Sequence, residues 1–321
     1  MIKRCTVIFG NGLGMALDSN YFSLETALYH VWENTDNLTQ DDKNLIIGAI
    51  KNTTQETPPK SEEQLDNLQV AIYAAEYLSN LEFNGLSWIS EAAKNIPKAF
   101  KLFIHEVALY FHFSGHFLPI EFINNFSSFT AATKSHVATL NYDNLLYDSL
   151  IGSKVMDGYN GDLIDGFWSS GFHHEHLDRH DMASLGWYLH LHGSPLFVGN
   201  RKLMRADKIF MSADQDHHIV LSHVQHKPFI ISSSPILTEY WIRLDRAFQE
   251  SGTIIVFGYS GLDEHLNLKI RSNNTKKIII IEWTGAGSQT GREKYWSNLL
   301  GRNDLIYYQL NNILEFKDWP M

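Results

Sequence analysis

The sequence predicts an α/β fold, a Rossmann-like doubly wound parallel sheet with a helical insertion after its first strand, turn and helix. Short and nearly unbroken apolar runs recur along the chain, which is typical of parallel strands buried on both faces. Helical patterns lie between several of these runs, which indicates alternating strands and helices. Polar residues follow the runs where they end, and open α/β sheets bind ligands at the carboxyl ends of their strands.

The first apolar run ends at Phe9 and leads into glycines at alternate positions. Glycines let the backbone approach a phosphate, and the start of a helix offers it unpaired N–H groups. The spacing is Gly-x-Gly-x-Gly, because Met15 stands where the dinucleotide motif has its third glycine. A tight strand-to-helix turn without a ligand explains the same residues. The candidates for cofactor binding in this turn are Gly10, Asn11, Gly12 and Gly14.

Residues 21–130 are expected to form the helical insertion, within a single domain that spans residues 1–321. Ser61-Glu62-Glu63-Gln64 resembles a capping box at the start of one of its helices. The insertion is dense in aromatic residues such as Phe100, Phe103 and Tyr110. We expect them to pack helix against helix, and the alternative is that they form the surface of an oligomer.

The remaining chain returns to short apolar runs separated by helical patterns. Strands are predicted at 136–140, 187–191, 228–231, 253–257, 277–281 and 305–310. Helices are predicted at 144–150, 237–249, 263–271 and 292–300. The helix after Pro235 carries Tyr240, Trp241 and Arg243, which can line a pocket or pack in the core.

Composition excludes several classes of protein. The formal net charge of −10 argues against direct nucleic-acid binding, which needs a basic face. The single cysteine, Cys5, cannot build a disulfide framework or a cysteine zinc site. No signal-peptide pattern and no membrane-spanning apolar run are present, so we expect a cytoplasmic protein without membrane contact.

A histidine-rich segment at residues 173–181 is the strongest candidate for metal binding. It carries His173, His174, Glu175, His176, Asp178, His180 and Asp181. Imidazole and carboxylate groups suit zinc, nickel or manganese, and His176 and His180 stand four residues apart. A polar loop explains the same residues, so metal binding stays open here and no metal ligand is assigned.

Four strand ends carry polar motifs in a fixed order along the chain. They are Gly10-Asn11-Gly12, Thr139-x-Asn141-x-Asp143, His192-Gly193 and Gly258-x-Ser260 with Asp263. This series resembles the sirtuin superfamily, and more closely the bacterial sirtuin-like proteins of antiphage defence that degrade NAD. The resemblance covers the opening turn and about residues 135–283, and domains of this family commonly carry a helical insertion where residues 21–130 stand.

The resemblance implies a role for each matching residue. Asn141 would lie beside the nicotinamide ribose and take part in catalysis, and His192 would be the catalytic base. Asp143 would lie near the nicotinamide carboxamide. The remaining candidates for NAD binding are Gly193 and Asp263, with Gly258 and Ser260 facing phosphates and ribose and Glu282 holding the adenosine ribose.

The sequence departs from the family pattern in two places. Asn11 replaces the alanine of the family's Gly-Ala-Gly-x-Ser motif, and Gly14 replaces its serine, so the hydroxyl of that serine has no counterpart here. One cysteine cannot supply the four-cysteine zinc module of sirtuins that deacylate proteins. The resemblance therefore favours NAD cleavage over lysine deacylation, and no zinc is expected.

The residue types also fit this chemistry without the family. Cleavage of the nicotinamide–ribose bond passes through an oxocarbenium-like transition state. His192 can take a proton from the nucleophile, and Asn141 can orient a water or a ribose hydroxyl. The alternatives are that Asn141 caps the helix near Asn144 and that His192 only holds a loop. His190 should share a strand face with His192 and is a candidate partner for it.

We therefore expect an NAD+ glycohydrolase that releases nicotinamide and ADP-ribose, as the effector of an antiphage defence system. The resemblance implies activation by a signal or by a separate sensor, such as a HerA-type ATPase, an Argonaute or a nucleotide-binding protein. A homo-oligomer is also expected. The alternative is a regulatory or assembly subunit that binds NAD or ADP-ribose without turnover.

Overall fold

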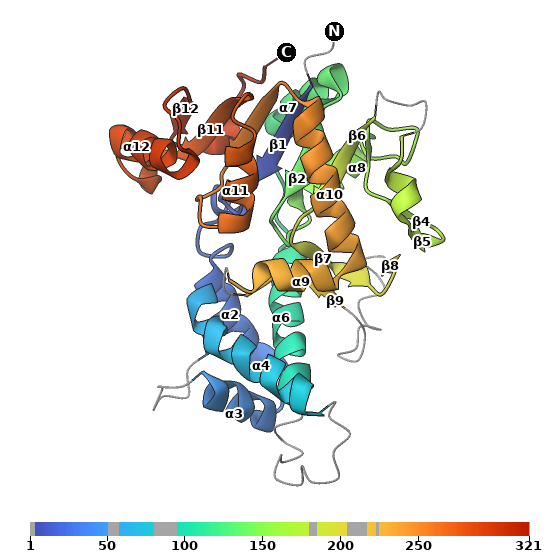
Figure 1. Ribbon diagram of the computed structural model, residues 1–321, viewed down its shortest axis with the longest axis vertical. Helices are drawn as coiled ribbons and strands as arrows, with labels where there is room; N and C mark the ends of the chain where they lie inside the picture. The colour runs from blue at the N-terminus through green and yellow to red at the C-terminus, as the bar shows by residue number, and fades with distance from the viewer. Residues whose placement is uncertain are drawn as a thin grey trace.

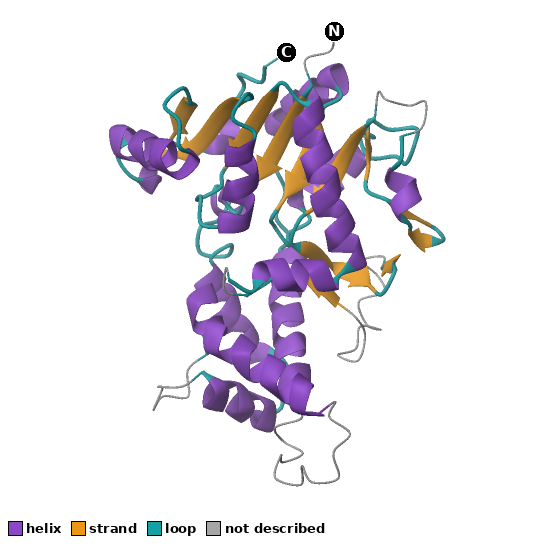
Figure 2. Ribbon diagram, in the orientation of Figure 1, coloured by secondary structure: helices purple, strands orange, loops and turns teal. Residues whose placement is uncertain are grey.

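The computed structural model describes residues 4–50, 58–79, 95–179, 185–203, 217–222 and 225–320. Its centre is a seven-stranded parallel sheet with the order β12-β11-β10-β1-β2-β6-β3. The strands are β1 (Cys5–Phe9), β2 (His136–Thr139), β3 (Leu163–Ile164), β6 (Gly186–His190), β10 (Thr253–Phe257), β11 (Lys277–Trp283) and β12 (Ile306–Leu310). Helices flank both faces of this sheet, so the predicted α/β class with a Rossmann-like layout is confirmed (Figures 1 and 2).

The central strands are buried on both faces, which explains their unbroken apolar sequences. In β1, Val7 and Phe9 belong to one core cluster, whereas Ile8 between them belongs to the other. Successive side chains of a strand point to opposite faces, so a strand in the middle of a sheet needs apolar residues at every position. Cys5 is one of these buried residues, with 2% of its surface exposed.

Each face of the sheet has its own layer of helices. The helices α7 (Ile120–Thr133) and α8 (Leu145–Gly152) cover one face. The helices α10 (Pro235–Glu250), α11 (Glu264–Ser272) and α12 (Gln289–Leu300) cover the other. The chain leaves β1 for β2 on one side and later returns to β10 on its other side. The strand order thus reverses at β1, where open α/β sheets bind their ligands.

A second group of helices stands off the sheet, beyond the carboxyl ends of its strands (Figure 2). We call it the helical block; it contains α2 (Leu24–Asn34), α3 (Gln40–Ala49), the short 3₁₀ helix η1 (Glu62–Gln64), α4 (Leu65–Ser79) and α6 (Ile96–His112). The aromatic residues of α6 pack helix against helix, as predicted. Phe103, for example, meets the ring of Trp32 from α2 edge to face at 5.7 Å.

The predicted insertion, residues 21–130, ends inside α7. This helix packs on the sheet, where Phe126 meets Phe9 of β1 edge to face at 5.1 Å. Among the described residues, the helices that stand off the sheet are therefore α2, α3, α4 and α6, whereas α7 belongs to a layer that covers it (Figure 1).

Two local predictions are wrong. Residues 228–231 are not a strand but part of the helix α9 (Lys227–Ser233), which Pro228 favours because proline suits the first turn of a helix. Ser61 makes no side-chain capping bond; Gln64 Oε1 instead accepts the backbone N–H of Lys60 at 2.8 Å. The glutamine therefore satisfies a backbone donor one residue before the expected cap.

Smaller elements complete the fold beside the sheet. They are the one-turn helix α1 (Gly12–Met15), the pair β4 (Phe167–Trp168) and β5 (Gly171–Phe172), the three-stranded sheet of β7 (Gly193–Val198), β8 (Arg201–Lys202) and β9 (His217–Ile219), and the 3₁₀ turns η2 (His174–Leu177), η4 (Thr284–Ala286) and η5 (Ile313–Glu315). Contacts of α6 with β7 and β9 join the helical block to the small sheet. In the described part of the chain, every helix is too short or too polar to cross a membrane.

Candidate functional site

His192 and Asp263 form a buried pair at the carboxyl ends of the strands. His192 follows β6, and Asp263 precedes α11, whose Leu266 N–H its Oδ1 accepts at 3.1 Å. His192 Nε2 lies 3.0 Å from Asp263 Oδ2, with 7% and 4% of the two side chains exposed. An ionised carboxylate can only accept, so Nε2 carries the proton and Nδ1 is left as the nitrogen that can take one.

The charge of Asp263 is stabilised by its neighbours. Burial alone raises the pKa of its carboxyl. The hydrogen bond from His192, with the charges of His192 and Lys227, outweighs burial and holds the pKa well below its usual range. Asp263 is therefore an anion that can orient His192 and stabilise the imidazolium formed when His192 accepts a proton.

The position of His192 is fixed through the backbone around it. The carbonyl of His192 accepts the N–H of Val220 at 3.0 Å, and the carbonyl of Leu191 accepts the indole N–H of Trp241 at 3.0 Å. Gly193 follows with φ +82°, and a Cβ there would lie 1.6 Å from the carbonyl oxygen of His218. Only glycine fits this turn, so the predicted His-Gly pair is needed to place the imidazole.

Asn141 lies at the end of β2 and reaches across to the glycine turn after β1. Its Nδ2 donates to the carbonyl of Gly10 at 3.1 Å, and its backbone N–H donates to Thr139 Oγ1 at 3.1 Å. The N-cap position of α8 is held by Asn144, so Asn141 is not the helix cap that the sequence left open. Asn141 Oδ1 is buried without a hydrogen-bond partner among the described residues.

Asp143 is a buried carboxyl two residues further on. Burial raises its pKa to about 7, although hydrogen bonds from the Leu145 N–H and from Asn141 oppose this rise. Its Oδ1 accepts the Leu145 N–H at 3.1 Å. Asp143 is therefore a group that changes charge near neutral pH, beside the amide of Asn141.

The glycines after β1 bring the turn that follows it against the turn after β10. Gly12 N–H donates to the carbonyl of Gly258 at 2.8 Å, and Gly10 N–H donates to the carbonyl of Phe257 at 3.0 Å. A Cβ at Gly12 would lie 2.5 Å from the Gly258 oxygen, and one at Gly10 would lie 2.7 Å from it. The two turns can touch only because these residues lack side chains, and Gly10, Gly12, Asn141 and Gly258 are thereby brought together.

The other two residues of the opening motif contact Phe22. A Cβ at Gly14 would lie 2.5 Å from the ring of Phe22, and Asn11 Nδ2 donates to the Phe22 carbonyl at 2.9 Å. These contacts hold the loop before α2 against the short helix α1. They explain both residues by packing, with no ligand required.

Ser260 and Glu282 lie further along the sheet edge and both contact Arg292 of α12. Ser260 is exposed, and its carbonyl accepts Arg292 Nη2 at 3.2 Å. Glu282 is buried at 4% exposure, accepts Arg292 Nε at 3.0 Å and accepts the hydroxyl of Tyr307 at 2.8 Å. Glu282 thus ties α12 and β12 together, and it would have to exchange these partners to hold a ribose.

The structure places His190 in a different environment from His192. In the described part of the chain its ring lies against Tyr188 at 4.9 Å and Phe197 at 5.2 Å, and its Nδ1 is buried without a hydrogen bond. Burial, with the nearby charge of Lys202, lowers its pKa to about 3. His190 is therefore a neutral core histidine. Its described contacts do not include His192, the partner that the sequence suggested.

The aromatic start of α10 packs in the core, with Tyr240, Trp241 and Arg243 buried. The hydroxyl of Tyr240 donates to the carbonyl of Asp165 at 2.8 Å, and the guanidinium of Arg243 pairs with Glu239 and Asp178. Together with the Trp241 bond to Leu191, these contacts fix α10 on the sheet.

Two charged residues of the site were not singled out from the sequence, Lys227 and Glu62. Lys227 Nζ lies 3.5 Å from Asp263 Oδ2 and 3.0 Å from Glu62 Oε2. Lys227 opens α9, and Glu62 belongs to η1 of the helical block. The sequence signal for Lys227 was its place before Pro228, because proline is common in the first turn of a helix. The apolar run at 228–231 was instead interpreted as a strand.

The histidine-rich segment carries no metal cluster among the residues that the structure describes. His173 and His176 lie with their rings 5.0 Å apart, and His176 Nδ1 donates to the carbonyl of Gly166 at 3.2 Å. His180 and Asp181 lie outside the described residues. His176 lies within η2, and its hydrogen bond to Gly166 joins the ring to a backbone carbonyl.

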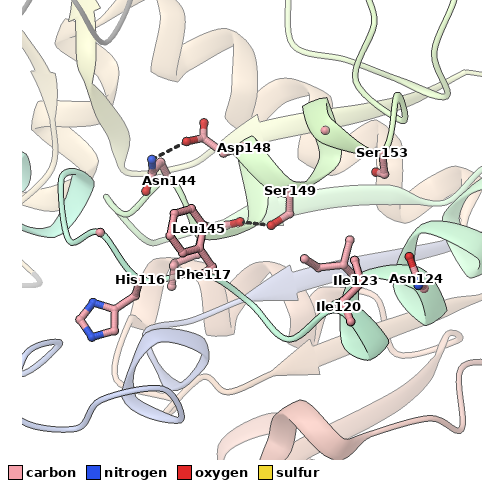
Figure 3. Close-up of a pocket in the computed structure, with 12 residues that line it drawn as sticks. His116, Phe117, Ile120, Ile123, Asn124, Asn144, Leu145, Asp148, Ser149 and Ser153 are labelled. Carbon is pink, nitrogen blue, oxygen red and sulfur yellow. Dashed lines mark hydrogen bonds between the residues drawn. The ribbon is translucent and has the colours of Figure 1, made fainter.

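A groove of about 410 Å³ lies between α7, α8 and the loop before α7 (Figure 3). It is lined by Gly115, His116, Phe117, Ile120, Ile123, Asn124, Asn144, Leu145, Asp148, Ser149, Gly152 and Ser153. The side chain of Asn144 donates to Asp148 within it. None of the predicted site residues lines this groove, although Leu145 joins it to Asp143 through the backbone bond described above.

No protein-family model and no curated protein sequence matches this chain significantly. The order of the motifs and the geometry of the site are therefore what a functional proposal can use.

Proposed function

We propose that this chain is an NAD+ glycohydrolase that splits NAD+ into nicotinamide and ADP-ribose at the carboxyl ends of β1, β2 and β6. The observation that carries the proposal is the buried His192–Asp263 pair, which leaves one imidazole nitrogen able to accept a proton. Asn141 supports it with a buried amide oxygen that lacks a donor among the described residues. A ribose hydroxyl or a water is the kind of donor that would satisfy this oxygen.

In the proposed reaction, the bond between the ribose C1 and the nicotinamide nitrogen breaks. Nicotinamide leaves with the bonding electrons, and because it was a cation it departs neutral without a proton from an acid. The transition state resembles an oxocarbenium ion. A water oxygen then bonds to C1, and its proton passes to His192 Nδ1 while Asp263 stabilises the imidazolium. Asn141 Oδ1 orients the ribose or the water.

Asp143 is proposed to contact the carboxamide of nicotinamide. Its pKa of about 7 means that near neutral pH the carboxyl is protonated in part of the molecules and ionised in the rest. The protonated form can donate to the carboxamide oxygen, and the ionised form can accept from its NH₂ group. The site therefore has a polar group for the leaving base beside the amide that orients the ribose.

The resemblance to sirtuin-like NADases is the support for a proposed biological role. We propose that the chain is a toxic effector of antiphage defence that depletes NAD when a signal or a sensor protein activates it. The proposed sensors are a HerA-type ATPase, an Argonaute or a nucleotide-binding protein, and the chain is proposed to form a homo-oligomer with or without such a sensor.

The test is to incubate the purified chain with NAD, alone and together with the proteins encoded beside it, to identify the products by mass spectrometry and to measure NAD binding by calorimetry. We expect nicotinamide and ADP-ribose in equal amounts, and loss of both in Asn141→Ala and His192→Ala. NAD that binds without being consumed would support the regulatory or assembly subunit instead. NAD that neither binds nor disappears contradicts both.

A further inference from the structure

Four charged or titratable side chains form a continuous series from the sheet to the helical block. The series runs from His192 to Asp263, then to Lys227 and finally to Glu62, with the distances of 3.0, 3.5 and 3.0 Å given above. The first three side chains are 7%, 4% and 5% exposed, and Glu62 is 34% exposed. The helical block thus reaches the buried pair through one lysine.

Lys227 is buried between two carboxylate partners, so that the loss of one leaves the other as its only close counter-charge. A buried ammonium group is costly to desolvate, and a close opposite charge offsets this cost. Asp263 supplies one such charge from the sheet side, and Glu62 supplies the other from the helical block. The position of Lys227 therefore depends on both layers of the molecule.

Lys227 and His192 share one oxygen atom, Asp263 Oδ2. Because Asp263 Oδ1 is held by the N–H of Leu266, the direction of the carboxylate is set by these contacts together. If Lys227 moves away, His192 is the one of these two groups that still contacts Asp263 Oδ2. The orientation and the protonation of the imidazole then both change.

We propose that Lys227 is a positioning residue for His192, and that Glu62 makes this positioning depend on the placement of the helical block. The proposal rests on the proposed function, because it assigns a regulator to the same base. A change in the position of η1 breaks the Glu62–Lys227 pair. Lys227 then changes its position relative to Asp263, and the proton affinity of His192 changes with it. The series is thereby a route by which an activating partner can reach the site.

Other titratable and charged groups surround the same series. Tyr142, on the loop after β2, donates its hydroxyl to the carbonyl of Val220 at 2.6 Å; burial, with the nearby charges of Glu62 and Asp263, raises its pKa. His265 of α11 interacts electrostatically with Asp263 and His192. Lys269 of the same helix pairs with Asp245. Glu62→Gln also removes one of the charges that raise the pKa of Tyr142, so the experiment must follow the His192 ring itself.

Substitutions at the two ends of the Glu62–Lys227 pair have opposite electrostatic effects on His192. Lys227→Met removes the cation that shares Asp263 Oδ2 with the imidazole, which favours the protonated form of His192. Glu62→Gln removes a negative charge and has the reverse effect. A neighbouring charge within a few ångströms shifts a titration by about one pH unit or more.

The experiment is to follow the His192 ring in ¹⁵N-histidine-labelled protein by NMR across a pH titration, with His192→Gln to assign its signals. We expect the midpoint to rise by about one pH unit in Lys227→Met, to fall in Glu62→Gln and to stay near wild type in Lys227→Arg. Glu63→Gln, on an exposed neighbour in the same turn, is the matched control and should change nothing. Folding of each variant is checked by circular dichroism.

Midpoints that shift together in the same direction, or that stay at the wild-type value in folded Lys227→Met and Glu62→Gln, overturn the proposal. If Lys227→Met does not fold, Glu62→Gln and Lys227→Arg still decide it. The NMR titration needs no turnover, so opposite shifts without nicotinamide release would sustain the positioning role and refute the hydrolase. If His192→Ala abolishes nicotinamide release but the NMR midpoints stay at the wild-type value, the hydrolase is supported and the positioning role of Lys227 is refuted.

Discussion

His192 Nε2 lies 3.0 Å from Asp263 Oδ2, although 71 positions separate the two residues in the sequence. The sheet order explains how they meet, because β6 and β10 lie on either side of the β1–β2 pair and end at the same edge. A buried imidazole paired with a buried carboxylate is an arrangement suited to general base catalysis. The predictions below test the pair, the groups around it and the turns that hold it.

Asp263→Asn should lower the rate of nicotinamide release at saturating NAD by about 10²-fold or more, because the imidazole loses the anion that orients and stabilises it. The Michaelis constant should change little, since Asp263 acts through His192. The control is Asp304→Asn, whose carboxylate pairs with Arg302 on the surface and is 71% exposed. An Asp263→Asn rate equal to that of the control would show that the pair has no catalytic role.

Asp143→Asn should stabilise the protein at high pH relative to wild type. The folded pKa of about 7 lies above the ordinary 3.8, so between these values the folded state binds the proton and the unfolded state does not. Wild-type stability contributed by Asp143 therefore falls as pH rises from about 4 to about 7, by roughly 4 kcal/mol at most. Asparagine does not titrate and escapes this loss.

Urea unfolding of wild type and Asp143→Asn at pH 5 and at pH 8 measures this difference directly. The free energy of unfolding of the variant minus that of wild type should be larger at pH 8. A difference that is the same at both values, or larger at pH 5, would mean that Asp143 is ionised throughout this range.

Gly12→Ala should destabilise the fold by about 1–3 kcal/mol, because the new methyl group would meet the Gly258 carbonyl and separate two turns of the site. Gly48→Ala is the matched control. Nothing lies within 4 Å of a Cβ there, and alanine favours the helix by up to about 1 kcal/mol. Equal unfolding midpoints for the two variants in urea would show that the close approach of the turns carries no stability.

Glu282→Gln should lower stability by about 1–3 kcal/mol, because the buried carboxylate accepts charged and neutral donors from Arg292 and Tyr307. Thermal unfolding measures this loss, and calorimetry with NAD measures the ribose contact that the resemblance implies. Weaker NAD binding at unchanged stability would assign Glu282 to the ligand and not to the α12 contact.

The fold could be predicted where both faces of a strand are buried. β1, β10 and β11 were found because their apolar runs are unbroken. The same reasoning failed at residues 228–231, because a short apolar run is equally compatible with a helix. Pro228 favours the helix, since it stands in the first turn of α9.

The site could be predicted only as a set of residues, not as a set of contacts. His192 and Asp263 follow from the order of the motifs, but nothing in their spacing says that they share a hydrogen bond. Glu62 and Lys227 are separated by 165 positions and belong to different layers of the fold, so their pairing exists only in three dimensions. Glu282 was expected to be open to a ligand, and the partners that occupy it come from α12 and β12.

The central claim is that His192 acts on NAD, and the most direct measurement is the rate of nicotinamide release by wild type, His192→Ala and His116→Ala. His116 lines the groove of Figure 3 and is the matched histidine outside the pair. We predict release by wild type and by His116→Ala at similar rates, with a loss of about 10²-fold or more in His192→Ala. Equal rates in wild type and His192→Ala would contradict the account, and loss of release in His116→Ala alone would also move the site to the groove.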